Sequence, residues 1–288
     1  MKQLSLVSAL ALLLAGPALS EVSGPYQIGL SMYSLRQLFK SGELHAHDYP
    51  DFAKDTFGIT KIDVWEGGFP EGWKKDPEFL PGLKNRADAA GSEIFLVMAG
   101  IVNATPAGDE ALRKNGLKFK RFVDQAVTLG APFVRVFVKA DNEVDEAEAI
   151  RRAVVALTGL TEYAQSKDVT IVIEPTSGSR KGSGAFLAAL AKTMDHSHCK
   201  LMPDFGKMIK SDIYQGTQDM MPYTVSVSAK GHDFKDDGSQ KDFDYPRLMK
   251  LIRDAGFTGI VSIEYEGKNL GPVEGVKAMK KLLEAGNL

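Results

Sequence analysis

The chain has 288 residues, with 35 basic and 37 acidic side chains and a formal net charge of −2 at pH 7. This near balance lacks the basic footprint of a nucleic-acid-binding protein, so we expect no nucleic-acid partner. A single cysteine, Cys199, excludes an intrachain disulfide, and we therefore expect the hydrophobic core to stabilise the fold.

The first twenty residues have the pattern of a signal peptide. Lys2 provides a positive charge, an apolar run over Leu4 to Ala15 follows, and Ala18-Leu19-Ser20 has small residues at a suitable cleavage position. The apolar run is shorter than the roughly 20 residues that a membrane-spanning helix needs. We predict cleavage near Ser20, a secreted or periplasmic protein without membrane association after cleavage, and one folded domain over residues 21–288.

Strand-like runs alternate with helical patterns along the rest of the chain. Strands are expected at residues 27–32, 61–65, 93–98, 133–138, 169–174, 200–204, 224–230 and 259–264. Helices are expected at residues 81–90, 109–129, 143–166, 245–255 and 273–285. This alternation predicts the α/β class with a parallel sheet, and eight units predict closure into a single (β/α)8 TIM barrel. An open doubly wound sheet is disfavoured, because no glycine-rich phosphate-binding motif follows the first strand.

Four strand-like runs in the second half of the chain end on polar, mostly acidic, residues. These are Glu174, Asp204, Lys230 and Glu264. The C-terminal strand ends of a (β/α)8 barrel converge on one mouth, where catalysis occurs. Gathering carboxylates there costs free energy, for which a metal ion or a proton-transfer role is the usual compensation. We therefore expect the functional site at this mouth.

The alternation of side chains along each strand predicts which residues face the barrel interior. Ser228 and Lys230 share one face of the seventh strand, and Ser262 and Glu264 share one face of the eighth. Small polar residues just below a terminal charged group are typical of a polar barrel mouth. The alternative is that Glu174 and Glu264 face outward and pair with helix lysines.

The histidines differ in how well they are placed for metal binding. His232 lies just beyond the seventh strand and is the best-placed nitrogen ligand, although a surface loop is an equal alternative. His196 and His198 precede the sixth strand, so we expect them at the opposite end of the barrel. His45 and His47 follow the first strand, and we expect them in a surface loop.

Six stretches of sequence carry a resemblance to a known family. They are IGLSMYSLR, GITKIDVWEGGFP, VIEP, LMPDFGK, VSAKGHDFKDDG and DAGFTGIVSIEYEG. They span essentially the whole predicted domain, and the last of them is the most specific. On these stretches the chain resembles the xylose isomerase-like TIM barrel superfamily and, within it, the sugar phosphate isomerases and epimerases.

The resemblance implies a divalent metal held by a Glu, an Asp, a His and a second Glu from strands five to eight. Matched by position, three of these ligands are Glu174, Asp204 and Glu264, and the two glutamates would also form the catalytic acid/base pair. The seventh strand reads Ser228-Ala229-Lys230 where relatives often have His-x-Lys. Either His232 supplies the missing ligand from the following loop, or the site has three protein ligands, or metal binding is weak.

Isomerising or epimerising a sugar requires removal of a proton from a carbon next to a carbonyl group. Oxygen-liganded Mn²⁺, Mg²⁺ or Co²⁺ suits this chemistry, with a carboxylate as the base. Lys230 or Lys207 would bind the substrate and neutralise charge that develops on its oxygen, and Trp65 would form an apolar wall against the sugar. Arg135 lies mid-strand among apolar residues and is interpreted as an inward ion-pair partner.

The sequence therefore predicts a secreted, metal-dependent sugar isomerase or epimerase with a small carbohydrate substrate. Export favours a free or oxidised sugar over a phosphorylated one. The alternatives are a lyase acting on a keto-sugar and a carbohydrate-binding protein without turnover. An abasic-site endonuclease shares this barrel but is disfavoured, because the chain lacks a rich histidine set and a basic groove.

Overall fold

The computed structural model describes residues 25–176, 182–208 and 212–286, so the predicted signal peptide lies outside the described residues. One sheet contains the strands in the order β6-β5-β4-β3-β2-β1-β8-β7, and all the neighbouring strands are parallel. The strands are β1 (Gln27–Leu30), β2 (Lys61–Trp65), β3 (Glu93–Ala104), β4 (Phe133–Ala140), β5 (Thr170–Glu174), β6 (Cys199–Leu201), β7 (Ser226–Gly231) and β8 (Ile260–Tyr265). Parallel bridges from Leu201 to Thr224 and from Asp204 to Ser228 connect β6 with β7. The predicted (β/α)8 barrel is thereby confirmed.

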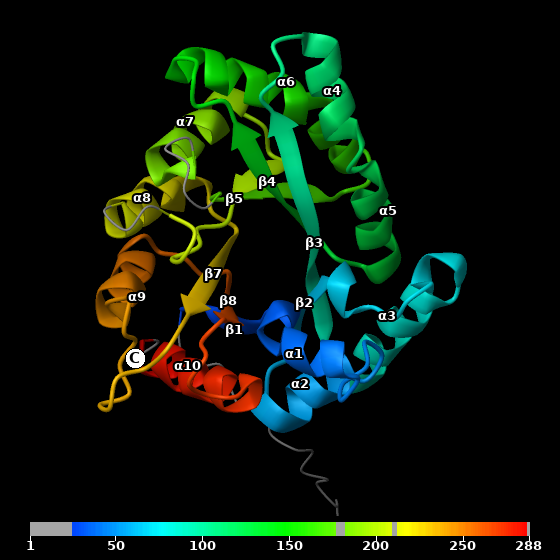
Figure 1. Ribbon diagram of the computed structural model, residues 1–288, viewed down its shortest axis with the longest axis vertical. Coiled ribbons are helices and arrows are strands. Elements are labelled where there is room, and N and C mark those ends of the chain that lie inside the picture. The colour runs from blue at the N-terminus through cyan, green and yellow to red at the C-terminus, as the bar shows by residue number, and fades with distance from the viewer. Residues whose placement is uncertain (1–24, 177–181, 209–211, 287–288) are drawn as a thin grey trace, which may run out of the picture.

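Helices surround the strands on the outside of the barrel (Figure 1). They are α1 (Arg36–Ser41), α2 (Tyr49–Phe57), α3 (Phe79–Ala90), α4 (Asp109–Leu117), α5 (Lys120–Leu129), α6 (Glu146–Gln165), α7 (Gly184–Met194), α8 (Ile213–Met220), α9 (Tyr245–Asp254) and α10 (Pro272–Gly286). Within the described ranges, no helix is both long enough and apolar enough to cross a bilayer.

Several elements differ from the sequence-based expectation: α1, α2, α7 and α8 were not among the expected helices, and β6 ends at Leu201, three residues before the expected end. The strand β3 continues beyond residue 98 to Ala104, and its pairing with β4 continues to the same residue after a shift in register. The helix expected over residues 109–129 is two helices, α4 and α5. The helix α4 packs closely on α6, since a Cβ at Gly116 would lie only 1.7 Å from the Ala156 carbonyl oxygen. The glycine therefore permits the contact, and α5 begins three residues after α4 ends.

The barrel has two hydrophobic clusters, one inside the strands and one between the strands and the helices. The inner cluster consists of Phe95, Leu96, Met98, Val172, Met202 and Ile260, all of which are buried. Val172 and Glu174 lie two residues apart on β5, so both side chains face the interior. The apolar inner cluster therefore forms the floor beneath the polar residues at the C-terminal strand ends.

Candidate active site

Three buried carboxylates meet at the C-terminal mouth of the barrel. Glu174 ends β5, Asp204 follows β6, and Glu264 lies near the end of β8. One carboxylate oxygen from each lies within 4.8 Å of the others, and the three residues are at most 5% exposed. The parallel strands bring these residues together because all of their C-terminal ends point to the same side.

Ser228 links two of the carboxylates from β7. Its Oγ lies 2.8 Å from Asp204 Oδ2 and 3.0 Å from Glu264 Oε2. A hydroxyl group has one proton, so it can donate to only one of these oxygens at a time. The other oxygen of Asp204 accepts hydrogen bonds from the backbone N–H groups of Gly206 and Lys207, each at 2.8 Å. Asp204 is therefore held in a fixed orientation.

Lys230 extends its ammonium group into the same cluster and is only 1% exposed. Its Nζ forms an ion pair with Glu264 and lies 3.5 Å from Asp204 Oδ2 and 2.5 Å from Glu266 Oε1. The backbone of Lys230 is also fixed, because its carbonyl oxygen accepts a 2.6 Å hydrogen bond from the Tyr245 hydroxyl. Lys230 is thus a buried positive charge that contacts carboxylates from two strands.

Arg135 on β4 supplies a second buried positive charge. Its Nε lies 2.8 Å from Glu174 Oε2, and one terminal nitrogen donates to the Ala99 carbonyl oxygen at 3.0 Å. Its guanidinium group also lies 4.2 Å from the centre of the Phe137 ring. The predicted inward ion-pair role of Arg135 is confirmed.

The two glutamates have pKa values that shift in opposite directions. Burial raises the pKa of Glu174 well above its usual value, and the neighbouring Asp204 and Glu264 reinforce this shift against the opposing effect of Arg135. Burial also opposes ionisation of Glu264, but the Lys230 ammonium outweighs it and lowers the pKa of Glu264 to about 2. Carboxyl groups whose environments separate their pKa values in this way are suited to act as an acid and a base.

The donor set fits a hard divalent cation. Three carboxylates and a hydroxyl offer oxygen atoms, which Mg²⁺ and Mn²⁺ prefer. Burial of all three acidic groups means that water compensates their charge poorly, so a cation would stabilise them. Glu174, Asp204 and Glu264 are therefore the residues that would hold a divalent metal.

His232 does not belong to this cluster of candidate metal ligands. Its Nδ1 lies 3.0 Å from Asp242 Oδ2, and its ring packs against Phe243. The imidazole lies in the loop after β7, where its side chain is 37% exposed. The Asp242 carboxylate accounts for the orientation of the imidazole. His232 therefore does not take the fourth metal-ligand position that the family resemblance implies.

The other residues expected to bind substrate lie around the mouth. Trp65 ends β2, is half-buried, and makes an edge-to-face contact with Tyr33 at 5.0 Å between ring centres. Lys207 is half-buried in the loop after β6, with its backbone N–H directed to Asp204. Lys230, by contrast, points into the carboxylate cluster.

Asp63 is a buried acidic residue that the sequence analysis did not single out. It lies in the middle of β2, is fully buried, and its Oδ1 accepts a 2.8 Å hydrogen bond from the Met32 N–H. Its Oδ2 has no hydrogen-bond partner among the described residues. Burial raises the pKa of Asp63 to about 8, against the Met32 hydrogen bond and with a further contribution from Glu264. An acidic residue between Ile62 and Val64 was the available signal.

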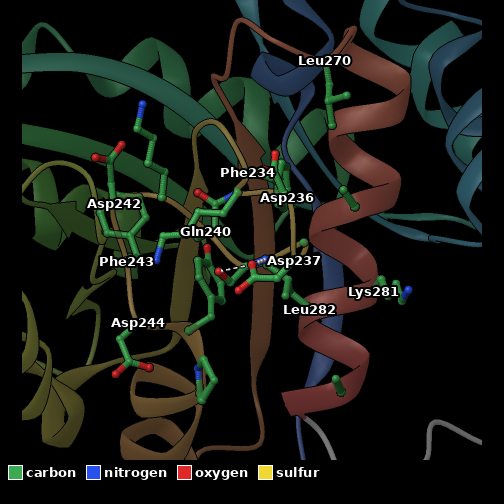
Figure 2. Close-up of a pocket in the computed structure, with 18 residues that line it drawn as sticks. Phe234, Asp236, Asp237, Gln240, Asp242, Phe243, Asp244, Leu270, Lys281 and Leu282 are labelled. Atoms are coloured by element: carbon green, nitrogen blue, oxygen red, sulfur yellow. Dashed lines mark hydrogen bonds between the residues drawn. The ribbon is translucent and has the colours of Figure 1, made fainter.

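A large surface pocket lies apart from the carboxylates. It has a volume of about 910 Å³ and lies between the loop after β7 and the helix α10 (Figure 2). Phe234, Leu270 and Leu282 contribute apolar surface, and Asp236 and Asp237 contribute acidic groups. None of the three clustered carboxylates lines it. The candidate active site is therefore defined by the buried charges at the barrel mouth and not by this surface pocket.

Comparison with known proteins identifies the family. The model of the xylose isomerase-like TIM barrel family matches residues 50–285. The chain belongs to this family, as the sequence stretches and the fold both indicate. No curated protein matches the chain by sequence.

Several solved structures share the fold at low sequence identity. D-psicose 3-epimerase from Clostridium cellulolyticum H10, solved with D-tagatose, has a TM-score of 0.67 at 13% identity, covering 90% of this chain and 96% of that one. A probable 3-DHS dehydratase from Bacillus anthracis has a TM-score of 0.69 at 16% identity, covering 89% and 98%. A xylose isomerase-like TIM barrel protein from Mycobacterium smegmatis in complex with magnesium has a TM-score of 0.59 at 16% identity, covering 91% and 98%.

Proposed function

We propose that the protein is a metal-dependent sugar isomerase or epimerase. The observation that supports this most directly is the buried cluster of Glu174, Asp204 and Glu264 at the barrel mouth, with oxygens within 4.8 Å of one another. The solved structure of D-psicose 3-epimerase, which shares the fold, adds support for a sugar substrate. The reaction would begin with removal of a proton from a carbon next to the sugar carbonyl.

Glu264 is suited to be the base that removes this proton. The adjacent Lys230 ammonium lowers its pKa to about 2, and a divalent cation at the same oxygens would likewise favour its ionised form. Glu174 is suited to return the proton, because its pKa is raised while that of Glu264 is lowered, so that it holds a proton more readily than Glu264 does. The two carboxyl groups come from β5 and β8, so they can approach a bound sugar from different sides. A bound divalent metal would act as a Lewis acid toward the carbonyl oxygen.

Residues at the rim would bind and orient the sugar. Lys207 lies beside Asp204 and would neutralise negative charge on a substrate oxygen. Trp65 would place its ring against an apolar face of the sugar. A free or oxidised sugar is the proposed substrate class, since the signal-peptide pattern of residues 1–20 supports export to the periplasm or outside the cell.

A lyase is a second candidate, favoured by the likeness to the probable 3-DHS dehydratase. Both reactions start with proton removal next to a carbonyl. They differ afterwards, because an isomerase returns the proton and a lyase expels a neighbouring hydroxyl group as water. A gain of solvent deuterium without loss of water from the sugar therefore distinguishes isomerisation or epimerisation from elimination.

The direct test is exchange of deuterium from D₂O into a panel of keto- and aldo-sugars with saturating Mn²⁺, Mg²⁺ or Co²⁺. We expect exchange into at least one sugar. Loss of a general base typically lowers the rate about 10²- to 10⁴-fold, which we expect for both Glu174→Gln and Glu264→Gln. The matched control is Glu274→Gln on the exposed surface of α10, which should exchange at the wild-type rate.

Each result has a clear meaning. If no sugar in the panel exchanges with any of the three metals, the isomerase proposal fails. If Glu264→Gln exchanges at the full rate, Glu264 does not remove the proton. Full-rate exchange by Glu174→Gln would likewise remove Glu174 from the acid/base pair.

A further inference from the structure

The Lys230 ammonium lies where a cation would neutralise the carboxylate cluster. It forms an ion pair with Glu264 and is 3.5 Å from Asp204 Oδ2. Both carboxylates belong to the group that would hold a divalent metal. The positive end of Lys230 and a metal ion would therefore be attracted by the same oxygens.

The surrounding structure makes room for the Lys230 side chain in this position. A Cβ at Gly206 would lie 2.5 Å from Lys230 Cγ, so glycine at that position leaves space for the lysine stem. Gly206 also donates its N–H to Asp204 Oδ1. The residue that leaves space for the Lys230 stem therefore also helps to fix the Asp204 carboxylate. The buried lysine is thus packed against the loop that holds Asp204.

Glu266 offers the ammonium group a partner outside the carboxylate cluster. Its Oε1 lies 2.5 Å from Lys230 Nζ, and its side chain is 24% exposed, whereas Lys230 is 1% exposed. Glu266 is not one of the three clustered carboxylates. A small movement toward Glu266 would keep Lys230 ion-paired and bring it closer to solvent.

Counting formal charges favours replacement of one cation by the other. The three carboxylates carry three negative charges when ionised, and the ion-paired Arg135 offsets one of them. Lys230 offsets another and leaves one negative charge. A divalent metal in place of the ammonium would leave none, whereas metal and ammonium together among the three carboxylates would leave an excess positive charge, which is costly unless the ammonium moves to the fourth carboxylate, Glu266.

We propose that the Lys230 ammonium and a divalent metal are alternative occupants of the cluster formed by Glu174, Asp204 and Glu264. On metal binding, Lys230 leaves the cluster and stays paired with Glu266. Lys230 is then a residue that sets metal affinity. This inference rests on the metal site of the proposed function but not on its substrate.

The first test measures binding of Mg²⁺ and Mn²⁺ to the metal-free protein by titration calorimetry. Coupling between two ligands typically changes affinity about 5- to 150-fold, and we expect Lys230→Met to bind metal more tightly by a factor in this range. Glu266→Gln should weaken binding, because the displaced ammonium then has no partner. In the double variant the Glu266→Gln effect should largely disappear, because Lys230 is no longer present.

The second test follows Lys230 in the wild-type protein and does not depend on the folding of any variant. Limited acetylation with acetic anhydride, measured on peptides by mass spectrometry, should modify Lys230 slowly without metal and at least several-fold faster at saturating Mg²⁺. Lys250, whose side chain is 66% exposed, serves as the internal control and should react equally in both samples.

The outcomes separate this inference from the proposed function. Unchanged metal affinity in Lys230→Met, or equal effects of Glu266→Gln with and without Lys230, would overturn it. Bound metal without any rise in Lys230 acetylation would also overturn it. Failure of all sugars to exchange deuterium, with these metal-binding results intact, would refute the isomerase but leave the exchange of cations standing.

Discussion

The buried ion pair between Arg135 and Glu174 gives a prediction that can be worked out in magnitude. The two side chains are 8% and 2% exposed, and their Nε and Oε2 atoms lie 2.8 Å apart. Removing one partner of a buried pair typically costs about 3–5 kcal/mol when the remaining group stays charged, and protonation of Glu174, whose pKa burial already raises, would place the loss toward the lower end of this range. For a domain of this size, with a shift of about 2–4 °C per kcal/mol, Arg135→Met should lower the Tm by about 6–20 °C.

Thermal unfolding in the presence of EDTA, followed by circular dichroism, is the appropriate assay. Lys250→Met is the matched control, since the Lys250–Asp254 pair has side chains that are 66% and 59% exposed. Exposed pairs contribute at most about 1 kcal/mol, so this control should change little. The double variant Arg135→Met/Glu174→Gln should recover part of the lost stability, because it removes both charges. If Arg135→Met shifts the Tm no more than the control, the pair does not hold Glu174 as we describe.

Three further predictions concern residues around the site. Asp63 has a pKa of about 8 in the folded protein against 3.8 as its reference, so its contribution to stability is present below about pH 4 and is lost as the pH rises to 8. Asp63→Asn should lack this loss, so the Tm of the variant minus that of the wild type, both in EDTA, should rise between pH 5 and 8. A Tm difference that stays constant over this range would contradict a buried, protonated Asp63 carboxyl. His232→Ala should leave Mn²⁺ affinity unchanged in calorimetry, because His232 pairs with Asp242; a marked loss would restore it as a ligand. Gly206→Ala should lower stability in EDTA by about 1–3 kcal/mol in denaturant titration, since the new Cβ meets the Lys230 stem; wild-type stability would show that the stem moves aside freely.

The strands were predictable from the sequence because their patterns are local. Apolar runs that end in Glu174 and Glu264 mark β5 and β8 to within a residue of their observed bounds. The break between α4 and α5 was not predictable in the same way. It lies beside a close approach between Gly116 and the backbone of α6, which is a contact between distant parts of the chain.

The clustering of the carboxylates was also within reach of sequence reasoning. Parallel strands place their C-terminal ends at one mouth, so Glu174, Asp204 and Glu264 converge once the barrel is recognised. The partners of these residues were harder to predict. Whether Lys230 points into the cluster or toward solvent depends on the space beside Gly206, and the orientation of His232 depends on a loop carboxylate ten residues later.

The buried charges are themselves an argument for function. Lys230 and Arg135 are 1% and 7% exposed and contact the three clustered carboxylates, which are at most 5% exposed. Well-packed apolar residues of similar volume often give a more stable protein than buried ion pairs do. The exposed Lys61–Glu93 pair, with side chains 28% and 47% exposed, has a much smaller cost, because water solvates both groups. Stability alone would therefore favour apolar residues at the barrel mouth. The acid/base chemistry and cation binding that we propose both require charged groups held away from water, and they would explain why the mouth keeps them.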